Sequence, residues 1–367
     1  MATTETLWKL DPHTVGKHLV LRAYLDAWLP IMSSANSRVL FIDGFAGPGE
    51  YAGGEEGSPQ IAMRALVDHS ASIKAEVAYF FIEKEADRAK HLETVVEGWK
   101  PKVPASTSVA VITGAFDDTM TSIFDYLDDK NSKLAPAFVM VDPFGVKGTP
   151  MSVVKRLLQN PRCEIYFSLM YEFLNRFKAS AEFEPHLDEL FGCSDWRDLI
   201  NIADTEERRM ALYDLYERQL RAAGAKQVIH FDIFDGNRLK YSIFFASQHE
   251  LGADRMKQAI WKAAPQGDFA FHGSQTPQLE LVASPNFGPL MDQLSAEFAD
   301  GNWHGISEIV SFVKSDKTDY HSGQVKTKTL KPMEVAGRLE VKPGTRTKAG
   351  TYPDGCMIKF KPLSKSA

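Results

Sequence analysis

Short apolar segments alternate with helical patterns through the first half of the chain, and this alternation restricts the fold more than any other feature. The runs RVLFID, EVAYFFIE, SVAVIT and PAFVMV are each followed by a segment of helical pattern, and CEIYFSLM supplies a fifth strand. Strands that are apolar along their whole length are typical of a parallel sheet covered on both faces. Right-handed crossovers between such strands predict an α/β, Rossmann-like doubly wound sheet.

The segment before the first strand, PHTVGKHLVLRAYLDAWLPIM, has a helical period. It predicts a helix that packs against the sheet. Its apolar face is expected to contain Val15, Leu19, Leu25, Trp28 and Leu29. On the same helix we expect His18 to be an ordinary surface residue.

Residues 172–225 interrupt the alternation with charged, helical sequence, which we interpret as a lid or an insertion. The segment KQVIHFDIFDGNRLKYSIFFASQH follows, and DGN between two apolar runs predicts an antiparallel hairpin at an edge of the sheet. After a helix over ADRMKQAIWKAA, the stretch SQTPQLELVASPNFGP is rich in turn residues and reads as a linker. We therefore expect one domain over 1–285 and a second over 286–367.

The second domain contains three helical segments followed by the strand-like runs RLEVKPG and CMIKFKP, as a winged-helix module would. Lys326 and Lys328 on the third helix, and Lys331 one turn on, would supply phosphate contacts if that helix enters a groove of nucleic acid. Pro332 should bend or shorten this helix. Many winged helices bind proteins instead, and that alternative stays open.

Charge is divided unevenly along the chain. Residues 301–367 hold 12 Lys and Arg against 6 Asp and Glu, whereas the first 300 residues hold 30 against 42. A basic module on an acidic body often marks contact with DNA or RNA, although a solvated lysine-rich tail gives the same count.

The composition is that of a soluble globular protein, and neither a membrane-spanning run nor a targeting segment is visible. We therefore expect a cytoplasmic protein. The three cysteines are far apart in sequence, which argues against a disulfide framework or a compact zinc motif. Paired histidine spacings and a serine nucleophile elbow are missing, so no metal site is expected.

The loop after the first strand, FIDGFAGPGEYAGGEEGSP, predicts a ligand site. Gly44, Gly47 and Gly49 allow the backbone to turn tightly and to approach a ligand closely. Their spacing, G-x-x-G-x-G, is neither the dinucleotide fingerprint nor a P-loop, so the ligand need not carry phosphate. Ser58 with Pro59 predicts the start of the next helix.

Acidic residues end the first two strands, at Asp43 and Glu83. An acid beside glycines suits an ammonium group, and a second acid suits ribose hydroxyls. S-adenosylmethionine carries both groups and no phosphate. The contrary interpretation is that both acids only cap adjacent elements. After the third strand, Phe116 could stack on the adenine ring and Asp117 could accept its amine, or Asp117 could simply begin a helix.

The fourth strand ends in VDPFG, where Asp142, Pro143 and Phe144 are the candidate catalytic residues. Amino-methyltransferases have an acid, a proline and an aromatic residue at this point. The carboxylate and a backbone carbonyl accept hydrogen bonds from the target amine, and the aromatic ring stacks on the base. A methyl group on sulfonium is already activated, so orienting the lone pair of the target amine is sufficient for methyl transfer. The alternative is an ordinary turn.

Several segments in order resemble the three-Cys-motif partner proteins, TcmP: HTVGKHLVLRAYLDAWLPI, FIDGFAGPGEYAGGEEGSP, VDPFG, LNRF, FASQHELGADRMKQAIWKA and TYPDG. The resemblance covers nearly the whole chain. It implies an S-adenosylmethionine methyltransferase-type core in which Phe45 joins the cofactor loop. It also implies a partner of radical-S-adenosylmethionine type that carries a C-x-x-x-C-x-x-C motif. The DPFG motif is similar to that of tRNA guanine-N2-dimethyltransferases. Relatives often have an acid where this chain has Ala115, which weakens the expected adenine contact.

The sequence therefore predicts a methyltransferase that uses S-adenosylmethionine on an exocyclic amine of a nucleobase in DNA or RNA, with residues 172–225 closing over the base. The alternative is a non-catalytic adaptor that keeps the methyltransferase fold, binds nucleic acid and recruits the three-Cys-motif partner.

Overall fold

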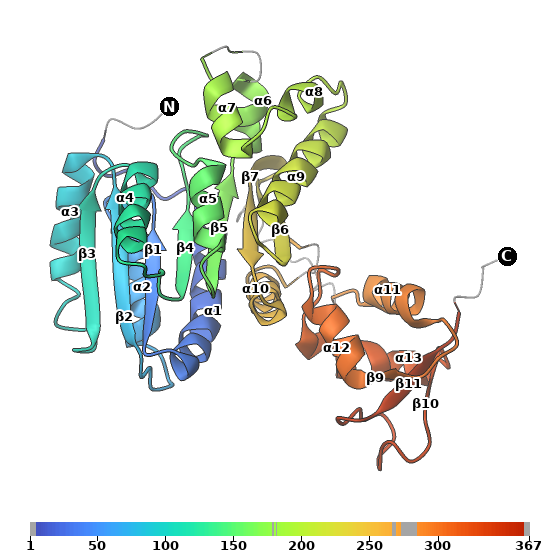
Figure 1. Cartoon of the computed structure of the whole chain (residues 1–367). Helices are drawn as coiled ribbons and strands as arrows, with labels where there is room; N and C mark the ends of the chain where they lie inside the picture. The colour runs from blue at the N-terminus through green and yellow to red at the C-terminus, as the bar shows by residue number, and fades with distance from the viewer. Residues whose placement is uncertain (1–4, 178–179, 181, 266–268, 273–284, 363–367) are drawn as a thin grey trace.

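A computed structural model of the chain describes residues 5–177, 180, 182–265, 269–272 and 285–362 (Figure 1). The expected linker falls largely within 273–284, outside the described residues. An eight-stranded sheet in the order β3-β2-β1-β4-β5-β7-β6-β8 forms the centre of the larger part. Its strands are β1 (Arg38–Asp43), β2 (Glu76–Glu83), β3 (Thr107–Thr113), β4 (Ala137–Val141), β5 (Cys163–Leu169), β6 (Gln227–Asp235), β7 (Arg238–Ser247) and β8 (Ala270–His272).

Strands β1 to β5 are parallel, and β7 runs antiparallel to β5 and to β6. Every residue of β4 and β5 is buried, which accounts for the apolar sequence of β4 and the largely apolar sequence of β5, where Glu164 and Ser168 are buried as well. The predicted α/β doubly wound sheet with an antiparallel hairpin is confirmed. The hairpin is not the outermost pair, however, because β8 adds to β6 in parallel.

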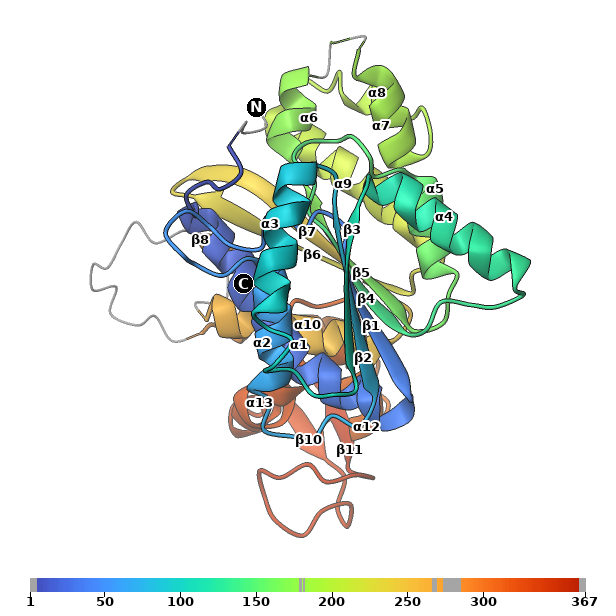
Figure 2. The same ribbon diagram turned by 90° about the vertical axis from the view of Figure 1, so that its left-hand side faces the viewer.

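Helices cover both faces of the sheet, as the view along the sheet in Figure 2 shows. α1, α2, α3 and α10 pack on one face, and α4, α5 and α9 pack on the other. The helices of this part are α1 (Pro12–Ala35), α2 (Ser58–Val67), α3 (Ala86–Glu97), α4 (Phe116–Asp129), α5 (Met151–Leu158), α6 (Tyr171–Phe177), α7 (Glu184–Phe191), α8 (Trp196–Leu199), α9 (Thr205–Ala222) and α10 (Glu250–Ala263).

Two local expectations about these helices were wrong. Val15 and Leu19 are 37% and 48% exposed, because α1 presents a neighbouring face to the sheet. That buried face contains Lys17, Val20, Leu21, Tyr24, Leu25, Trp28 and Leu29. Ser58 is the first residue of α2 and not its N-cap, and its hydroxyl donates to Asp43.

The segment 172–225 is helical as predicted, but its longest helix is part of the core. Leu212, Tyr216 and Leu220 of α9 are buried in the cluster that includes β5 and β7. This helix therefore covers a face of the sheet. The short helix α6 follows β5 directly and lies beside the loop after β4, where a Cβ on Gly145 would be 3.3 Å from the Phe173 ring.

The C-terminal part has its own apolar core, which Trp261 of α10 joins to the rest of the molecule. Its three-stranded antiparallel sheet has the order β10-β11-β9. Its elements are α11 (Gly288–Phe298), β9 (His304–Gly305), α12 (Ile306–Lys314), η1 (Ser322–Gln324), η2 (Val325–Leu330), α13 (Lys331–Val335), β10 (Leu339–Val341) and β11 (Met357–Phe360). We call residues 286–362 the C-terminal module. Its assignment as a winged helix and the boundary at 285 stay predictions.

The expected third helix of this module is divided into a 3₁₀ turn, the π-helical η2 and α13. Pro332 lies in the first turn of α13, where a missing N–H is tolerated. The wider turn of η2 immediately before it agrees with the expectation that proline disturbs this helix.

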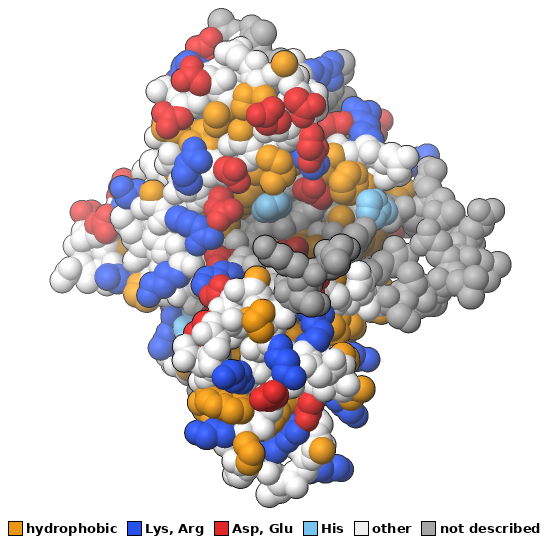
Figure 3. Space-filling view, turned by 90° about the vertical axis from the view of Figure 1, so that its right-hand side faces the viewer, with side chains coloured by type: hydrophobic (Ala, Val, Ile, Leu, Met, Phe, Trp, Pro, Cys, Tyr) orange, Lys and Arg blue, Asp and Glu red, His pale blue; other side chains and the backbone are white. Residues whose placement is uncertain are grey.

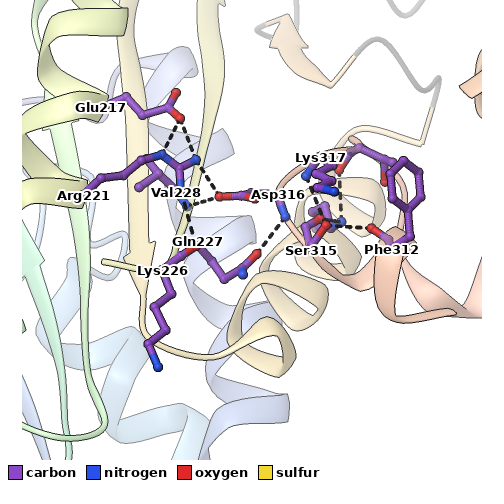
Figure 4. A network of polar contacts seen from close by, with 11 residues as sticks. Glu217, Arg221, Lys226, Gln227, Val228, Phe312, Ser315, Asp316 and Lys317 are labelled. Carbon is purple, nitrogen blue, oxygen red and sulfur yellow. Dashed lines mark hydrogen bonds and ion pairs between the residues drawn. The ribbon is translucent and has the colours of Figure 1, made fainter. Parts of the chain in front are cut away.

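Polar contacts hold the C-terminal module against the amino end of β6 (Figure 4). The Asp316 carboxylate accepts hydrogen bonds from Arg221 Nη2 (2.7 Å) and from the Val228 N–H (2.8 Å). The Asp316 N–H donates to Gln227 Oε1 over 2.8 Å. These three contacts link the module to α9 and β6 at once.

A buried lysine makes the second link, between the module and helix α10. Lys257 of α10 donates from Nζ to the carbonyl oxygens of Val313 (2.5 Å), Ser315 (2.6 Å) and Thr318 (3.0 Å). It thereby satisfies carbonyl groups in the last turn of α12 and in the segment that follows it. Burial lowers the pKa of Lys257 to about 8. Among the described helices, none is long and apolar enough to cross a membrane.

Candidate functional site

A cavity of about 250 Å³ opens at the carboxyl ends of β1 and β4. These neighbouring strands lie where the strand order reverses direction, which is the usual ligand position in an open α/β sheet. The cavity walls come from the segment before α1, from α1 itself, from the loops after β1 and β4, and from β7. Its lining residues include Trp8, Lys17, His18, Phe45, Gly47, Gly49, Glu50, Tyr51, Asp142, Pro143, Phe144, Met170 and Tyr241.

The glycine loop after β1 needs its glycines for two reasons. Gly47 and Gly49 have φ of 60° and 86°, which L side chains rarely adopt. Gly57 lies so close to the loop that a Cβ there would be 2.8 Å from the Gly49 carbonyl oxygen. The predicted candidates Phe45, Gly47 and Gly49 line the cavity.

Asp43 lies beneath the loop and is fully buried. Its carboxylate accepts hydrogen bonds from Ser58 Oγ (2.6 Å) and from the Phe45 N–H (3.2 Å). Burial raises the pKa of Asp43 to about 7, although both hydrogen bonds act in the opposite direction. Asp43 is not part of the cavity lining, and its contacts hold the loop to the start of α2.

Glu83 is also buried beneath the same loop. Its two carboxylate oxygens accept hydrogen bonds from the N–H groups of Gly47 and Glu85, each over 2.8 Å. It too lies outside the cavity lining. The two acids at the strand ends therefore shape the loop, and their contacts with a cofactor stay predictions.

The remaining cofactor candidates are Gly44, Phe116 and Asp117, and two of them, Gly44 and Phe116, pack together. The Phe116 ring is so close to Gly44 that a Cβ on this glycine would be 2.4 Å from it. The same ring lies 5.8 Å from that of Phe45. Asp117, in the first turn of α4, is half-buried. Gly44, Phe116 and Asp117 do not line the cavity.

The three candidate catalytic residues lie in the loop after β4, whereas the glycine loop follows β1. Asp142, Pro143 and Phe144 all line the cavity. The Phe144 ring is 61% exposed and contacts Trp8 edge-on, with 5.7 Å between the ring centroids. The structure thus brings the glycine loop and the DPF segment together, as their positions at strand ends predicted.

Sequence reasoning missed the partner of Asp142. Lys17 Nζ of α1 lies 2.5 Å from Asp142 Oδ2, and the two side chains are only 7% and 25% exposed. The same ammonium lies 4.3 Å from the centre of the Tyr241 ring on β7. The sequence did contain a signal for this, because Lys17 has the helical spacing of Leu21, Tyr24 and Trp28 and therefore lies on the buried face of the helix.

His18 was predicted to be an ordinary surface residue, and this was wrong. It lines the cavity, where burial lowers its pKa to about 4 and the charge of Lys17 acts in the same direction. Its ring nitrogen Nε2 is 3.5 Å from the Tyr51 hydroxyl of the glycine loop. The histidine is therefore neutral near pH 7.

The candidate nucleic-acid contacts Lys326, Lys328 and Lys331 are all exposed. On the face in Figure 3, Lys and Arg side chains are spread over the lower part of the molecule, which is the C-terminal module. This module lies beside the amino end of β6, whereas the cavity opens at the carboxyl ends of β1 and β4 (Figure 1). The lysines and the cavity are therefore at opposite ends of the sheet.

Comparison with known proteins gives similarities of fold only. No protein-family model matches the sequence, and no curated protein matches it. Trm1 from Pyrococcus horikoshii with S-adenosyl-L-methionine is 11% identical with a TM-score of 0.38, over 71% of this chain and 61% of that one. An O-methyltransferase from Bacillus cereus in complex with SAH is 15% identical with a TM-score of 0.33, over 62% and 80%. The METTL16 methyltransferase domain is 14% identical with a TM-score of 0.31, over 61% and 66%.

The chain thus spans about three fifths of the length of the Trm1 structure. Because all three TM-scores are below 0.5, none of these proteins decides the family or the reaction. The fold assignment rests on the observed strand order and on the antiparallel β7, the sheet expected of a methyltransferase-type core.

Proposed function

We propose that the protein is an S-adenosylmethionine-dependent methyltransferase that acts on an exocyclic amine of a nucleobase in DNA or RNA. The observation that carries this proposal is the meeting of the glycine loop with Asp142, Pro143 and Phe144 in one cavity at the carboxyl ends of β1 and β4. The Trm1 structure, in which S-adenosyl-L-methionine is present, has a similar arrangement of elements at low identity.

The cavity suits a sulfonium nucleoside. The carboxylates of Asp11, Glu50 and Asp142 and several aromatic rings line it, and aromatic faces attract cations. The one Lys17 ammonium in the lining is paired with Asp142, which leaves the other two carboxylates to attract the cationic groups of the cofactor. The exposed backbone of Gly47 and Gly49 allows close approach of an amino-acid group. The volume of about 250 Å³ is slightly below the range of roughly 300–1,000 Å³ for ligand sites, so we expect lining side chains such as Trp8 or the exposed Phe144 to move when cofactor and base are both bound.

S-adenosylmethionine, when bound, supplies a methyl group whose bond to sulfur breaks as the bond to the target nitrogen forms, and the electron pair stays on sulfur. Asp142 accepts a hydrogen bond from the target amine and directs the nitrogen lone pair away from itself. The nitrogen then loses a proton to this carboxylate. Phe144 provides an exposed ring on which the base stacks, and Pro143 restricts the backbone between them. A base in a duplex would have to be flipped out.

Two measurements test this proposal. Calorimetric titration should detect S-adenosylmethionine binding to the wild type and to Asp142→Asn, since the carboxylate acts on the amine. Transfer of labelled methyl to mixed DNA and RNA should be lost in Asp142→Asn and kept in the control Asp118→Asn, which replaces an exposed carboxylate outside the cavity lining. Absence of heat with the wild type would remove the cofactor from the proposal.

A second candidate function is the adaptor without catalytic activity. Two observations favour it: an expected acid is replaced by Ala115, and Phe116, which was expected to stack on adenine, packs against Gly44 and does not line the cavity. Binding of nucleic acid without methyl transfer, in the presence and absence of the partner, would support the adaptor.

The resemblance to the TcmP proteins leads us to propose a radical-S-adenosylmethionine-like partner with a three-Cys motif. For the C-terminal module we propose a winged-helix fold that binds DNA or RNA. Lys326, Lys328 and Lys331 are exposed, and no ion pair to another described residue engages them, which leaves their charges available to phosphates. Co-purification with the partner and salt-dependent binding of nucleic acid test these two proposals separately.

A further inference from the structure

The ion pair between Lys17 and Asp142 connects segments that are 125 residues apart in sequence. Lys17 is on α1 and Asp142 follows β4, so no local interaction accounts for their pairing. Burying an ammonium and a carboxylate is costly unless they bind each other. Both side chains nevertheless line the cavity wall at the candidate catalytic position.

The lysine ammonium has a second neighbour in Tyr241. This buried residue of β7 places the centre of its ring 4.3 Å from Nζ, within the range of a cation–π interaction. Helix α1, the loop after β4 and strand β7 therefore hold one positive charge in place. The adjacent His18 is neutral, so it does not share this role.

The geometry divides the two oxygens of Asp142 between two tasks. Lys17 binds Oδ2, and within the described chain no hydrogen bond reaches Oδ1. The side chain is 25% exposed and lines the cavity, which leaves Oδ1 for an incoming hydrogen-bond donor. A donor bound there would have a fixed positive charge a few ångströms away.

We propose that Lys17 determines the specificity of the site by restricting the acceptor to an uncharged nitrogen. A nucleobase amine is neutral and can donate to Asp142 beside the ammonium. A lysine side chain or another alkylamine is protonated near pH 7, and its charge would be repelled by Lys17. This inference rests on the proposed methyltransferase function and names its substrate class.

The effect is large enough to measure. Two unit charges about 5 Å apart at an effective dielectric constant of about 20 repel each other by an energy that corresponds to roughly 300-fold in affinity. Because the pair is partly open to solvent, we expect at least about tenfold.

Binding of two small amines tests the proposal without requiring methyl transfer. Aniline is uncharged at pH 7 and benzylamine is cationic, and both carry the same ring. Ligand-observed NMR titration should show that the wild type prefers aniline. In Lys17→Met, the affinity for benzylamine should rise at least tenfold relative to the affinity for aniline. Lys17→Arg keeps the charge and should keep the wild-type order, as should the control Lys9→Met at an exposed position.

A merely structural role for Lys17 predicts a different result. The affinities for both amines would then change by the same factor in Lys17→Met, and this result would overturn the proposal. A folded Lys17→Met protein with an unchanged preference between the two amines would overturn it as well. The double variant Lys17→Met with Asp142→Asn should lose the gain for benzylamine, because the attracting charge is gone. If Lys17→Met does not fold, Lys17→Gln takes its place.

Calorimetry of the same samples separates the two proposals. Failure of S-adenosylmethionine to bind the wild type would contradict the methyltransferase function and leave the amine preference measurable. Binding of S-adenosylmethionine with no change of amine preference would contradict the role of Lys17 alone.

Discussion

Replacing Asp43 by asparagine should stabilise the protein, compared with the wild type, more at pH 8 than at pH 5. In the folded state burial raises the pKa of Asp43 from 3.8 to about 7. Its pKa is thus higher when folded than when unfolded, so its contribution to stability is complete below pH 3.8 and is lost as the pH rises through about 7. Asparagine carries no titratable proton and keeps one acceptor oxygen for Ser58 or for the Phe45 N–H.

The magnitude follows from the window between the two pKa values. Each unit corresponds to about 1.36 kcal/mol, and the range from pH 5 to about 7 covers roughly two units. The unfolding free energy of the wild type should therefore fall by about 2.7 kcal/mol relative to the variant between pH 5 and pH 8. Urea unfolding of both proteins at the two pH values measures this difference, and titrations common to both proteins cancel.

The companion variant Ser58→Ala removes a hydrogen bond that lowers the pKa of Asp43. It should enlarge the loss of stability between pH 5 and pH 8. A difference between wild type and Asp43→Asn that stays constant within about 0.5 kcal/mol across this range would refute the assignment of a buried, costly carboxylate.

Three further predictions concern the packing and the basic module. Lys257→Met should destabilise the junction by about 3 kcal/mol or more, because three buried carbonyls lose their donor, and a lowered melting temperature or faster amide exchange in α12 would show it. Gly57→Ala should weaken S-adenosylmethionine binding at least tenfold in calorimetry, because its Cβ would lie 2.8 Å from a backbone oxygen of the glycine loop. Neutralising Lys326, Lys328 and Lys331 together should reduce the salt slope of nucleic-acid binding by about 1 per lysine; unchanged affinity would point to a protein partner.

The sheet was predictable because its evidence is local. The central strands β1, β4 and β5 are almost entirely buried, so their sequences are largely apolar, and each strand from β1 to β5 is followed by a helix. The three-residue β8 was not predicted, because so short a strand shows no alternation that distinguishes it from a loop. The face of α1 was also misjudged, because apolar residues occur around much of this helix and only tertiary packing selects which of them are buried.

The site was predictable where it follows strand ends. Gly47 and Asp142 were expected at the cavity because both immediately follow central parallel strands. Lys17 and Tyr241 were not, because their positions depend on how α1 and β7 pack around β4. The sequence likewise could not predict which way the side chains of Asp43 and Glu83 point, since a residue at a strand end can face either the ligand or the loop backbone.

The location of the C-terminal module at the far end of the sheet sets a minimum size for any substrate held by both sites of one chain. The strands of the sheet are 5 to 10 residues long apart from β8, and at about 3.3 Å per residue they extend roughly 17–33 Å. A duplex rises about 3.4 Å per base pair, so roughly 5 to 10 base pairs are needed to pass from one end to the other. Under the proposed function, shorter oligonucleotides should engage either the lysines or the cavity, and only longer ones should have the base selected at a fixed offset from the point where the strand is held.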